Sequence, residues 1–538
     1  MTAAVRRGYF ASMTPDLPAA HRTLGQALRD TATRWPERDA LLSEQRCLSW
    51  AQLDAEVDQL AGLLHSLGVK KGDVVGGVIT KRPEVVTTFL ACARIGAMYA
   101  PVNFKLHMDR VRFQFDNAKI RCVVTEASFD KVLKPLMRFL SDPSKVVYVG
   151  ELGRHGTTQY SQLSAHSDPG VETSPEEPCY LNYTSGTTGE PKGALTSHFN
   201  ILYQALTAFD GDTGLTPDGF EGMGFSTPDV FLGMFSVFAH PHELFHRSLV
   251  CGGAFVIVDS LNPRIIARAI EGFSVTWMMA VPSFYEMLLD HMQAGGEKLS
   301  SLRVLESGGA FVSAETLRKM EEAFGASFMP VWGSTETTGV AVAMRPDRPR
   351  KPGTTGTPIS GYEVKVVDSH GRDCKPGETG EMLVRGPAVI SQYLNNPEET
   401  VALFVAGWYH TRDLVTRGED GFIQFVGRRS DMLKIGGIRV YPLEIERVIK
   451  DHPQVRDVVV VRAEERVRGE IARAVISTVP GSDLTVRSVQ SYCRDRLAIY
   501  KVPRIVEFWD EVPKLPNGKL NRRAVVDVPV NAKRDDRE

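Results

Sequence analysis

The sequence lacks any C-x-x-C pair, although it contains seven cysteines. They are dispersed along the chain, at Cys47, Cys92, Cys122, Cys179, Cys251, Cys374 and Cys493. An odd and scattered set of this kind does not indicate a disulfide framework. The cysteines therefore predict a protein of a reducing compartment.

An excess of charge of one sign is also missing, because 63 basic residues stand against 65 acidic residues and the net charge is −2. This balance gives no electrostatic case for nucleic acid or an anionic membrane as the main partner. The longest apolar stretch, at residues 249–258, is too short to span a bilayer. The N-terminus has no apolar core of signal-peptide length, and the C-terminus has no S-K-L ending. We therefore expect a cytoplasmic protein without a transmembrane segment.

What the sequence does contain is a regular alternation of strand and helix patterns. Its 538 residues are too many for one hydrophobic core and predict two or more domains. Short runs rich in valine and isoleucine precede helical patterns, as residues 74–80 precede 83–97 and residues 254–260 precede 263–273. This order predicts an α/β fold of parallel sheets with helices on their faces.

The pattern changes twice toward the C-terminus. From about residue 355, short strands with frequent turns predict a small β-rich subdomain. After "GRRSD" (427–431) the chain returns to helix and strand. We place a boundary near Ser430, between a large domain of helix-flanked sheets over residues 1–429 and a smaller α+β domain over residues 430–538.

The strongest local signal is "YLNYTSGTTGEPKGA", residues 180–194. A short strand over residues 180–183 runs into a loop rich in glycines and hydroxyl groups, with one lysine. Converging backbone N–H groups, hydroxyl donors and a point charge suit a triphosphate. The loop is not a Walker A loop, because Lys192 is followed by glycine. A flexible surface turn is the alternative; the predicted phosphate-binding residues are Thr184, Ser185, Gly186, Thr187, Thr188, Gly189 and Lys192.

This stretch resembles the signature of the adenylate-forming superfamily, which includes acyl-CoA synthetases, aryl-CoA ligases, luciferases and peptide-synthetase adenylation domains. The resemblance extends from residues 48–73 to "PKLPNGKL" at residues 513–520, with several motifs in the family's order. It implies an N-terminal AMP-binding domain with a small β-barrel-like subdomain. It also implies a mobile C-terminal domain that carries the catalytic lysine.

The resemblance assigns roles to residues of the large domain. "ESGGAFVS" (306–313) implies Gly309 and Ala310 beside the adenine base. "VWGSTETT" (331–338) resembles the Y-G-x-T-E motif, with Trp332 in place of tyrosine and Gly333 after it. There Thr335 is implied to contact phosphate and Glu336 to bind Mg²⁺, a hard cation that prefers carboxylate oxygen. Without the family context, "TET" would be a helix start.

Further motifs span the predicted domain boundary. "GWYHTRDL" (407–414) implies that Asp413 binds the ribose hydroxyls, with Arg412 where many members have glycine. The hinge-like stretch at residues 427–446 implies Arg428 as a second ribose or phosphate contact, and Ser430 stands where many relatives have aspartate or lysine. The predicted contacts to the thiol acceptor or the phosphates are Lys434, Gly436, Gly437 and Arg439, and the predicted catalytic lysine is Lys519.

The reaction implied has two halves and uses ATP, Mg²⁺ and coenzyme A. A carboxylate attacks the α-phosphate to give an acyl-adenylate and pyrophosphate, with Lys192, Thr335, Glu336 and Lys519 as the catalytic set. The C-terminal domain then rotates near Ser430, withdraws Lys519 and opens a path for the thiol.

A competing signal is "HPHELFH" (240–246), which matches the H-E-x-x-H motif of zinc hydrolases. On one helix, His242 and His246 would share a face and bind zinc, with Glu271 as a remote third ligand. A match this short also arises by chance. We interpret His240 as the family histidine that gates the acyl pocket, at the start of a helix, and its two neighbours as packing or surface residues.

The same segment bears on the substrate. Ala239, His240 and Pro241 stand where amino-acid-activating relatives carry aspartate, which excludes an α-amino acid. Gly333 leaves room for a medium- or long-chain fatty or an aromatic acyl group, so His240 and Gly333 are the predicted acyl contacts. Residues 209–229 are interpreted either as the pocket entrance or as a disordered surface loop.

Free CoA is the predicted acceptor, and a separate carrier protein is the alternative. Luciferase-type oxidation and a non-enzymatic binding protein are further alternatives. We expect a monomer or a homodimer that acts in fatty acid metabolism.

Overall fold

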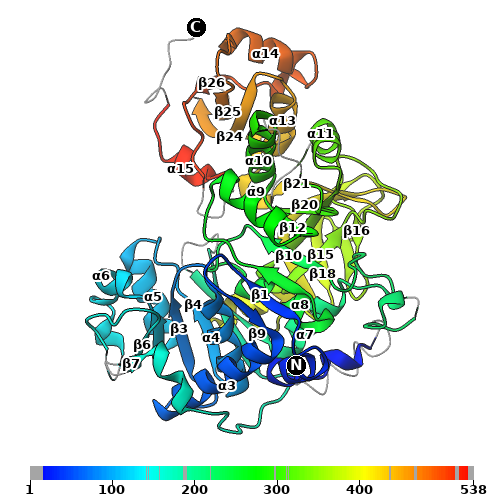
Figure 1. Cartoon of the computed structure of the whole chain (residues 1–538). Helices are drawn as coiled ribbons and strands as arrows, with labels where there is room; N and C mark the ends of the chain where they lie inside the picture. The colour runs from blue at the N-terminus through cyan, green and yellow to red at the C-terminus, as the bar shows by residue number, and fades with distance from the viewer. Residues whose placement is uncertain are drawn as a thin grey trace.

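The computed structural model describes residues 16–140, 142, 145–156, 158–185, 191–218, 220–295, 299–309, 312, 314–435, 438–465, 469–514 and 520–530. A larger body carries the N-terminus, and a smaller C-terminal part lies at one end of it (Figure 1). No helix in these ranges is long and apolar enough to cross a lipid bilayer. The cytoplasmic location stays a prediction.

Two sheets form the body. Within the described residues, the first has nine strands in the order β16 (Thr357–Pro358), β15 (Gly339–Ala343), β14 (Ser327–Ser334), β13 (Val304–Gly308), β12 (Trp277–Ala280), β10 (Val230–Gly233), β11 (Ala254–Val256), β1 (Asp39–Leu42) and β2 (Cys47–Ser49). The second has seven described strands in the order β7 (Thr158–Gln159), β6 (Val146–Tyr148), β5 (Cys122–Thr125), β3 (Val74–Val78), β4 (Met98–Pro101), β8 (Pro178–Ser185) and β9 (Pro191–Ser197). Most of these strands are parallel, so the predicted α/β fold is confirmed.

Helices cover these sheets because their apolar residues recur at helical spacing. The body's helices are α2 (Leu24–Arg34), α3 (Trp50–Ser66), α4 (Pro83–Arg94), α5 (Met108–Ala118), α6 (Asp130–Leu133), α7 (His198–Leu206), α8 (His246–Cys251), α9 (Pro263–Gly272), α10 (Pro282–Gly295), α11 (Ala314–Phe324) and α12 (Pro397–Leu403). Every residue of α4 is buried. α4 lies beside α3 next to β3 and β4 (Figure 1), and its two charged residues, Glu84 and Arg94, are paired with neighbouring charged side chains.

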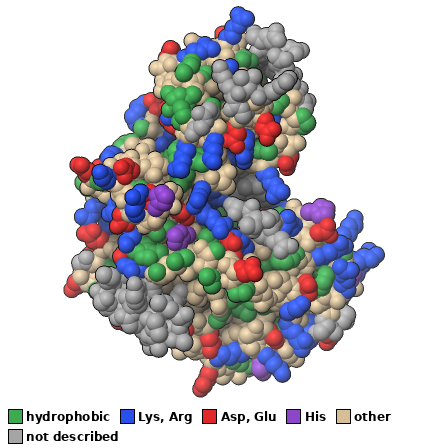
Figure 2. Space-filling model, turned by 180° about the vertical axis from the view of Figure 1, so that it is seen from behind, with side chains coloured by type: hydrophobic (Ala, Val, Ile, Leu, Met, Phe, Trp, Pro, Cys, Tyr) green, Lys and Arg blue, Asp and Glu red, His purple; other side chains and the backbone are tan. Residues whose placement is uncertain are grey.

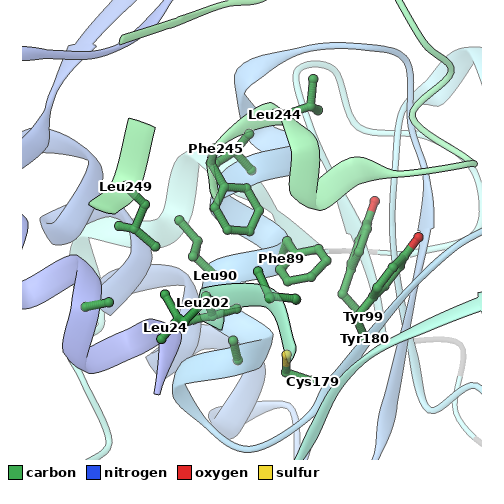
Figure 3. Packing of buried hydrophobic residues seen from close by; sticks show 14 of the residues in the cluster. Leu24, Phe89, Leu90, Tyr99, Cys179, Tyr180, Leu202, Leu244, Phe245 and Leu249 are labelled. Carbon is green, nitrogen blue, oxygen red and sulfur yellow. The ribbon is translucent and has the colours of Figure 1, made fainter. Parts of the chain in front are cut away.

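One aromatic cluster joins the seven-stranded sheet to the residue that precedes α8. The ring of Phe89 on α4 lies 5.3 Å from the rings of Tyr99 and Tyr180 and 5.1 Å from that of Phe245, centroid to centroid. Figure 3 shows these rings packed together, with aliphatic side chains around Phe245. Because Tyr180 belongs to β8 and Phe245 precedes α8, the cluster fixes the glycine-rich hairpin against the segment that contains HELFH.

The predicted β-rich subdomain is an antiparallel sheet. In the described residues it runs in the order β17 (Glu363–Val367), β18 (Thr379–Arg385), β20 (Trp408–Arg417) and β19 (Phe404–Val405), and β21 (Ile423–Arg428) pairs with β20. The β20–β21 pair carries two of the predicted ribose-contacting residues at one end.

The C-terminal part has its own sheet and core. Its described strands run in the order β23 (Ile438–Val440), β22 (Leu433–Ile435), β25 (Gly469–Thr478) and β24 (Val455–Glu465), with β26 (Ile505–Phe508) beside β25. The helices are α13 (Pro442–Lys450), α14 (Val486–Arg494) and α15 (Arg522–Val526). Lys450 of α13 lies 3.2 Å from a carboxylate oxygen of Glu286 on α10, which joins this part to the body. The boundary at residue 430 stays a prediction.

Gly252 tests the close packing beneath α8. It ends α8 with φ +65°, and a Cβ atom there would lie 2.2 Å from the Trp35 ring. We predict that Gly252→Ala lowers stability by roughly 2–6 kcal/mol, because left-handed strain and overpacking each cost about 1–3 kcal/mol. Urea unfolding followed by fluorescence measures the change.

Gly325→Ala is the matched control, because Gly325 directly follows α11 with φ +64° but a Cβ atom there would meet nothing within 4 Å. An equal loss of stability in both variants would contradict the packing argument.

Candidate functional site

The glycine-rich segment is a hairpin of β8 and β9. Thr184 pairs with Lys192, and Ser185 pairs with Pro191, across the two strands. Lys192 therefore lies on β9 rather than in the loop, which corrects the sequence-based placement. Gly186, Thr187, Thr188 and Gly189 lie outside the described residues.

Lys192 points into a buried group of charges. Its ammonium, on a side chain only 7% exposed, forms an ion pair with Glu399 of α12. The same carboxylate oxygen of Glu399 lies 2.9 Å from the Arg412 guanidinium. The Lys192 ammonium also lies 5.9 Å from the centre of the Tyr393 ring. Sequence reasoning singled out neither Glu399 nor Tyr393, because a negative charge in a helix's first turn and an aromatic before it are common surface features.

Glu336 lies at the centre of the site, 8% exposed. It belongs to the 3-10 helix η8 (Thr335–Thr337), which begins after β14 and is capped by the side chain of Ser334. The Tyr393 hydroxyl donates a 2.7 Å hydrogen bond to Oε1 of Glu336. Burial and this carboxylate raise the pKa of Tyr393 far above its usual range, so its phenol remains a donor.

Thr335 joins this turn to the glycine-rich hairpin. Its hydroxyl accepts a 3.3 Å hydrogen bond from the side-chain amide of Asn182 on β8. The same amide donates to the backbone carbonyl of Ala239. Both predicted phosphate-contacting segments are thereby held together, and the residue before His240 is held to them.

The Asp413 carboxylate contacts two side chains that are predicted to surround the nucleoside. The indole N–H of Trp332 donates a 2.9 Å hydrogen bond to Oδ2 of Asp413. Nε of Arg428 lies 3.4 Å from Oδ1. Asp413 and Arg428 are direct partners across β20 and β21, which explains how residues 15 positions apart meet. The structure thus brings together three residues that the sequence assigned to adenine and ribose.

Backbone conformation at Gly309 and close packing at Gly333 each require glycine. Gly309 follows β13 with φ +83°, a conformation that favours glycine. A Cβ atom at Gly333 would lie 2.2 Å from the Gly339 carbonyl oxygen, so the pairing of β14 and β15 requires glycine there. Ala310 lies outside the described residues.

The remaining predicted residues belong to the C-terminal part. Lys434 and Arg439 are exposed and pair with each other across β22 and β23. Figure 2 shows Lys and Arg side chains gathered where this part meets the body. Gly436, Gly437 and Lys519 lie outside the described residues.

Comparisons with known proteins match both parts of the chain. Residues 28–394 match the model of the AMP-binding enzyme family, and residues 444–519 match its C-terminal domain. The chain belongs to the AMP-binding enzyme family. The predicted resemblance to adenylate-forming ligases is therefore confirmed.

Individual relatives of this AMP-binding enzyme span nearly its whole length. An indoleacetate–CoA ligase of Aromatoleum aromaticum is 31% identical over 91% of this chain and 94% of its own. A fatty acid–[acyl-carrier-protein] ligase of Streptomyces coeruleorubidus is 29% identical over 94% of this chain and 96% of its own. The crystal structure of an anthranilate CoA ligase in complex with anthranoyl-AMP is similar with a TM-score of 0.87, at 26% identity over 95% of this chain and 98% of that one.

The HELFH residues of this AMP-binding enzyme do not lie on one helix. His242 belongs to the 3-10 helix η7 (Pro241–Leu244), whereas His246 begins α8, and Phe245 between them has φ −151° and ψ −25°. This corrects the expectation of a helix start at HPHELFH. Nε2 of His242 lies 3.1 Å from the carbonyl oxygen of Thr338. Among the described residues, no group of three or more His, Cys, Asp or Glu is placed to hold a metal ion.

A buried ion pair next to this segment was not expected from the sequence. The Arg247 guanidinium donates a 2.7 Å hydrogen bond to Glu306, which also accepts a 2.9 Å hydrogen bond from the indole of Trp277. A second carboxylate, that of Glu243, lies 3.6 Å from Arg247. The sequence signal was Glu306 itself, because a single carboxylate within the apolar strand β13 indicates that a positively charged partner is buried beside it. Burial raises the pKa of Glu243 to about 7, against the lowering effect of Arg247.

Residues 209–229, of which all but residue 219 are described, pack against the body. Phe220, Met223 and Phe225 are buried. Arg345 donates hydrogen bonds of 3.0 and 2.9 Å to the two carboxylate oxygens of Asp210. The alternative of a disordered surface loop is wrong for the described residues.

Substitution of Glu243 tests how its raised pKa affects the stability of the protein. Its pKa is raised in the folded enzyme, so its ionisation costs stability as pH rises from about 4.5 to about 7. We predict that Glu243→Gln has little effect on stability near pH 5 but stabilises the protein at pH 8, by up to about 3 kcal/mol. Thermal unfolding at both pH values measures the difference.

Glu271→Gln, on the exposed side of α9, is the control and should shift both midpoints equally. A Glu243→Gln effect that is the same at pH 5 and pH 8 would show that Glu243 is not held neutral by burial.

Proposed function

We propose that this AMP-binding enzyme activates an aromatic carboxylic acid with ATP and transfers the acyl group to coenzyme A. The observation that carries the proposal is the arrangement around Tyr393 and Glu336. The Tyr393 hydroxyl donates to Glu336, and the Lys192 ammonium lies 5.9 Å from the Tyr393 ring. Thr335 precedes Glu336 in η8, and Trp332 on the preceding strand donates to Asp413. These provide a cation, a hydroxyl, an oriented carboxylate and an aromatic plane, which together suit a bound nucleoside triphosphate.

The residues around Glu336 fit a magnesium ion. Mg²⁺ prefers carboxylate oxygen and usually bridges phosphates. Glu336 is buried, and the Tyr393 hydroxyl fixes the orientation of its carboxylate. When bound, the ion would neutralise charge on the departing pyrophosphate. Glu336 would orient it, and Thr335 would donate to a phosphate oxygen.

The nucleoside would be held by Trp332, Asp413 and Arg428, together with the turn at Gly309. The Asp413 carboxylate accepts hydrogen bonds and therefore suits the ribose hydroxyls. In this proposal Lys519 aligns the carboxylate of the acid with the α-phosphate during the first half-reaction. Rotation near Ser430 then withdraws Lys519 and brings the segment with Lys434, Gly436, Gly437 and Arg439 to the thiol path.

Two observations favour an aromatic acid over a fatty acid. Two relatives, the indoleacetate–CoA ligase and the anthranilate CoA ligase, are named for aromatic acids. In addition, the segment that His242 joins to the Thr338 carbonyl carries the buried polar side chains of Glu243 and Arg247, and Arg247 pairs with Glu306. A long alkyl chain gains most from apolar walls, whereas polar groups can bind ring substituents or a ring N–H. His240 remains the proposed gate of this pocket.

A carrier protein as acceptor is the second candidate function. The fatty acid–[acyl-carrier-protein] ligase of Streptomyces coeruleorubidus supports it because it aligns with 94% of this chain. The two functions share the adenylation half-reaction and differ only in the thiol.

Pyrophosphate release tests the proposed reaction. With ATP and Mg²⁺, we predict multiple turnovers only when CoA is added, and faster turnover with indoleacetate or anthranilate than with octanoate. Glu336→Gln should lower kcat by about 10²–10³-fold, because a charged group acting on the developing charge is lost. Lys519→Ala should block the first half-reaction more than the second.

Glu419→Gln, an exposed carboxylate, is the control and should retain full activity. A single burst of pyrophosphate that CoA does not relieve would favour the carrier protein as acceptor. No release with any acid would overturn the proposal.

A further inference from the structure

Arg412 has a backbone conformation that usually belongs to glycine. Its φ is +60°, within the left-handed region that side chains with a Cβ atom rarely adopt. It also occupies the position where many members of the resembled family have glycine. The surrounding strand β20 imposes this conformation next to Asp413, so an arginine there is strained and calls for a compensating interaction.

The compensating interaction is with Glu399. The Arg412 guanidinium lies 2.9 Å from Oε1 of Glu399, and the Lys192 ammonium pairs with the same oxygen. The three side chains are 36%, 14% and 7% exposed for Arg412, Glu399 and Lys192, respectively. One partly buried carboxylate is thus shared by a cation from the glycine-rich hairpin and a cation from the ribose-side turn.

The helix α12 holds Glu399 in place. Its N-cap residue, Asn396, accepts a 3.1 Å hydrogen bond from the backbone N–H of Glu399. Glu398, in the same first turn, is exposed. The two glutamates therefore share a helix end but differ in what their carboxylates contact, which makes Glu398 a matched control.

The Glu399 carboxylate and a bound triphosphate would compete for the Lys192 ammonium. Lys192 is the cation that the proposed function assigns to the phosphates, yet Glu399 binds it where it is nearly buried. Releasing Lys192 alone would leave the Glu399 carboxylate without a counter-ion in a poorly solvated position, which is costly. With Arg412 present, Glu399 keeps a bound cation after Lys192 has moved.

We propose that Arg412 and Glu399 are a pair of positioning residues, in which Arg412 retains Glu399 so that Lys192 can turn to the triphosphate. The inference rests on the proposed function, because it assumes that ATP binds at this site. Neither residue takes part in the chemical step. Their effect belongs to ATP binding and should appear in KM for ATP rather than in kcat.

Arg412→Gly is the first variant. Glycine adopts a φ of +60° without strain, so the substitution should not disturb the backbone. Without the arginine, Glu399 would hold Lys192 fully, so we expect KM for ATP to rise about tenfold, roughly the contribution of one charge-assisted contact. The value of kcat should change less than threefold, and the dissociation constant of ATP, measured by calorimetry without the acid, should rise in parallel.

Glu399→Gln in the same chain is the decisive second variant. Once the carboxylate is neutral it no longer competes for Lys192, so Arg412→Gly should change KM for ATP less than twofold in the Glu399→Gln background. A Glu398→Gln background should leave the tenfold effect unchanged. A merely structural role for Arg412 would give the same loss in all three backgrounds.

The outcomes separate the two proposals. If the unaltered enzyme releases no pyrophosphate with any acid, the proposed function fails first. If it is active but Arg412→Gly leaves KM and the dissociation constant for ATP unchanged, the inference is wrong. It is equally wrong if the tenfold effect persists with Glu399→Gln.

Discussion

The packing of Phe89 against three other aromatic rings is the contact on which the arrangement of the site depends. It joins a fully buried helix of the seven-stranded sheet to Tyr180 on the glycine-rich hairpin and to Phe245 beside the nine-stranded sheet. The Tyr180 hydroxyl also donates a 3.1 Å hydrogen bond to the Ala239 carbonyl. Aromatic pairs combine large apolar burial with a preferred geometry. The phosphate-side and acyl-side segments are thereby held in a fixed relation.

Around this apolar contact, the buried charges are arranged in partnered groups. Arg247 lies between Glu306 and Glu243, and Lys192 shares Glu399 with Arg412. Each group is costly to desolvate and is tolerated because its members compensate one another. Charges held in this way can be redistributed by a charged ligand at lower cost than isolated ones, since a partner remains after one member moves.

The sequence was sufficient for the fold and for the family, because local patterns and contiguous motifs carry both, whereas the roles of the motif residues stay predictions. Periodicity predicted β3 with α4 and β11 with α9, because parallel strands and amphipathic helices carry local patterns. It could not place Lys192 on β9, since the register of a hairpin depends on both strands. Tyr393 and Glu399 were missed because their partners lie 57 and 207 positions away. HELFH matched the zinc motif by spacing alone, and a spacing of four implies a shared face only where the backbone is helical.

The hydrogen bond between Trp332 and Asp413 has an optical consequence. Indole emission depends on what its N–H group contacts, and here that contact is the carboxylate proposed to receive the ribose. A ligand that engages Asp413 must share or displace the indole, while a base stacked on the ring would quench it. Trp332 therefore forms a built-in fluorophore at the proposed nucleoside site, and a chain that keeps only this tryptophan would emit differently when that site is filled, without any added dye.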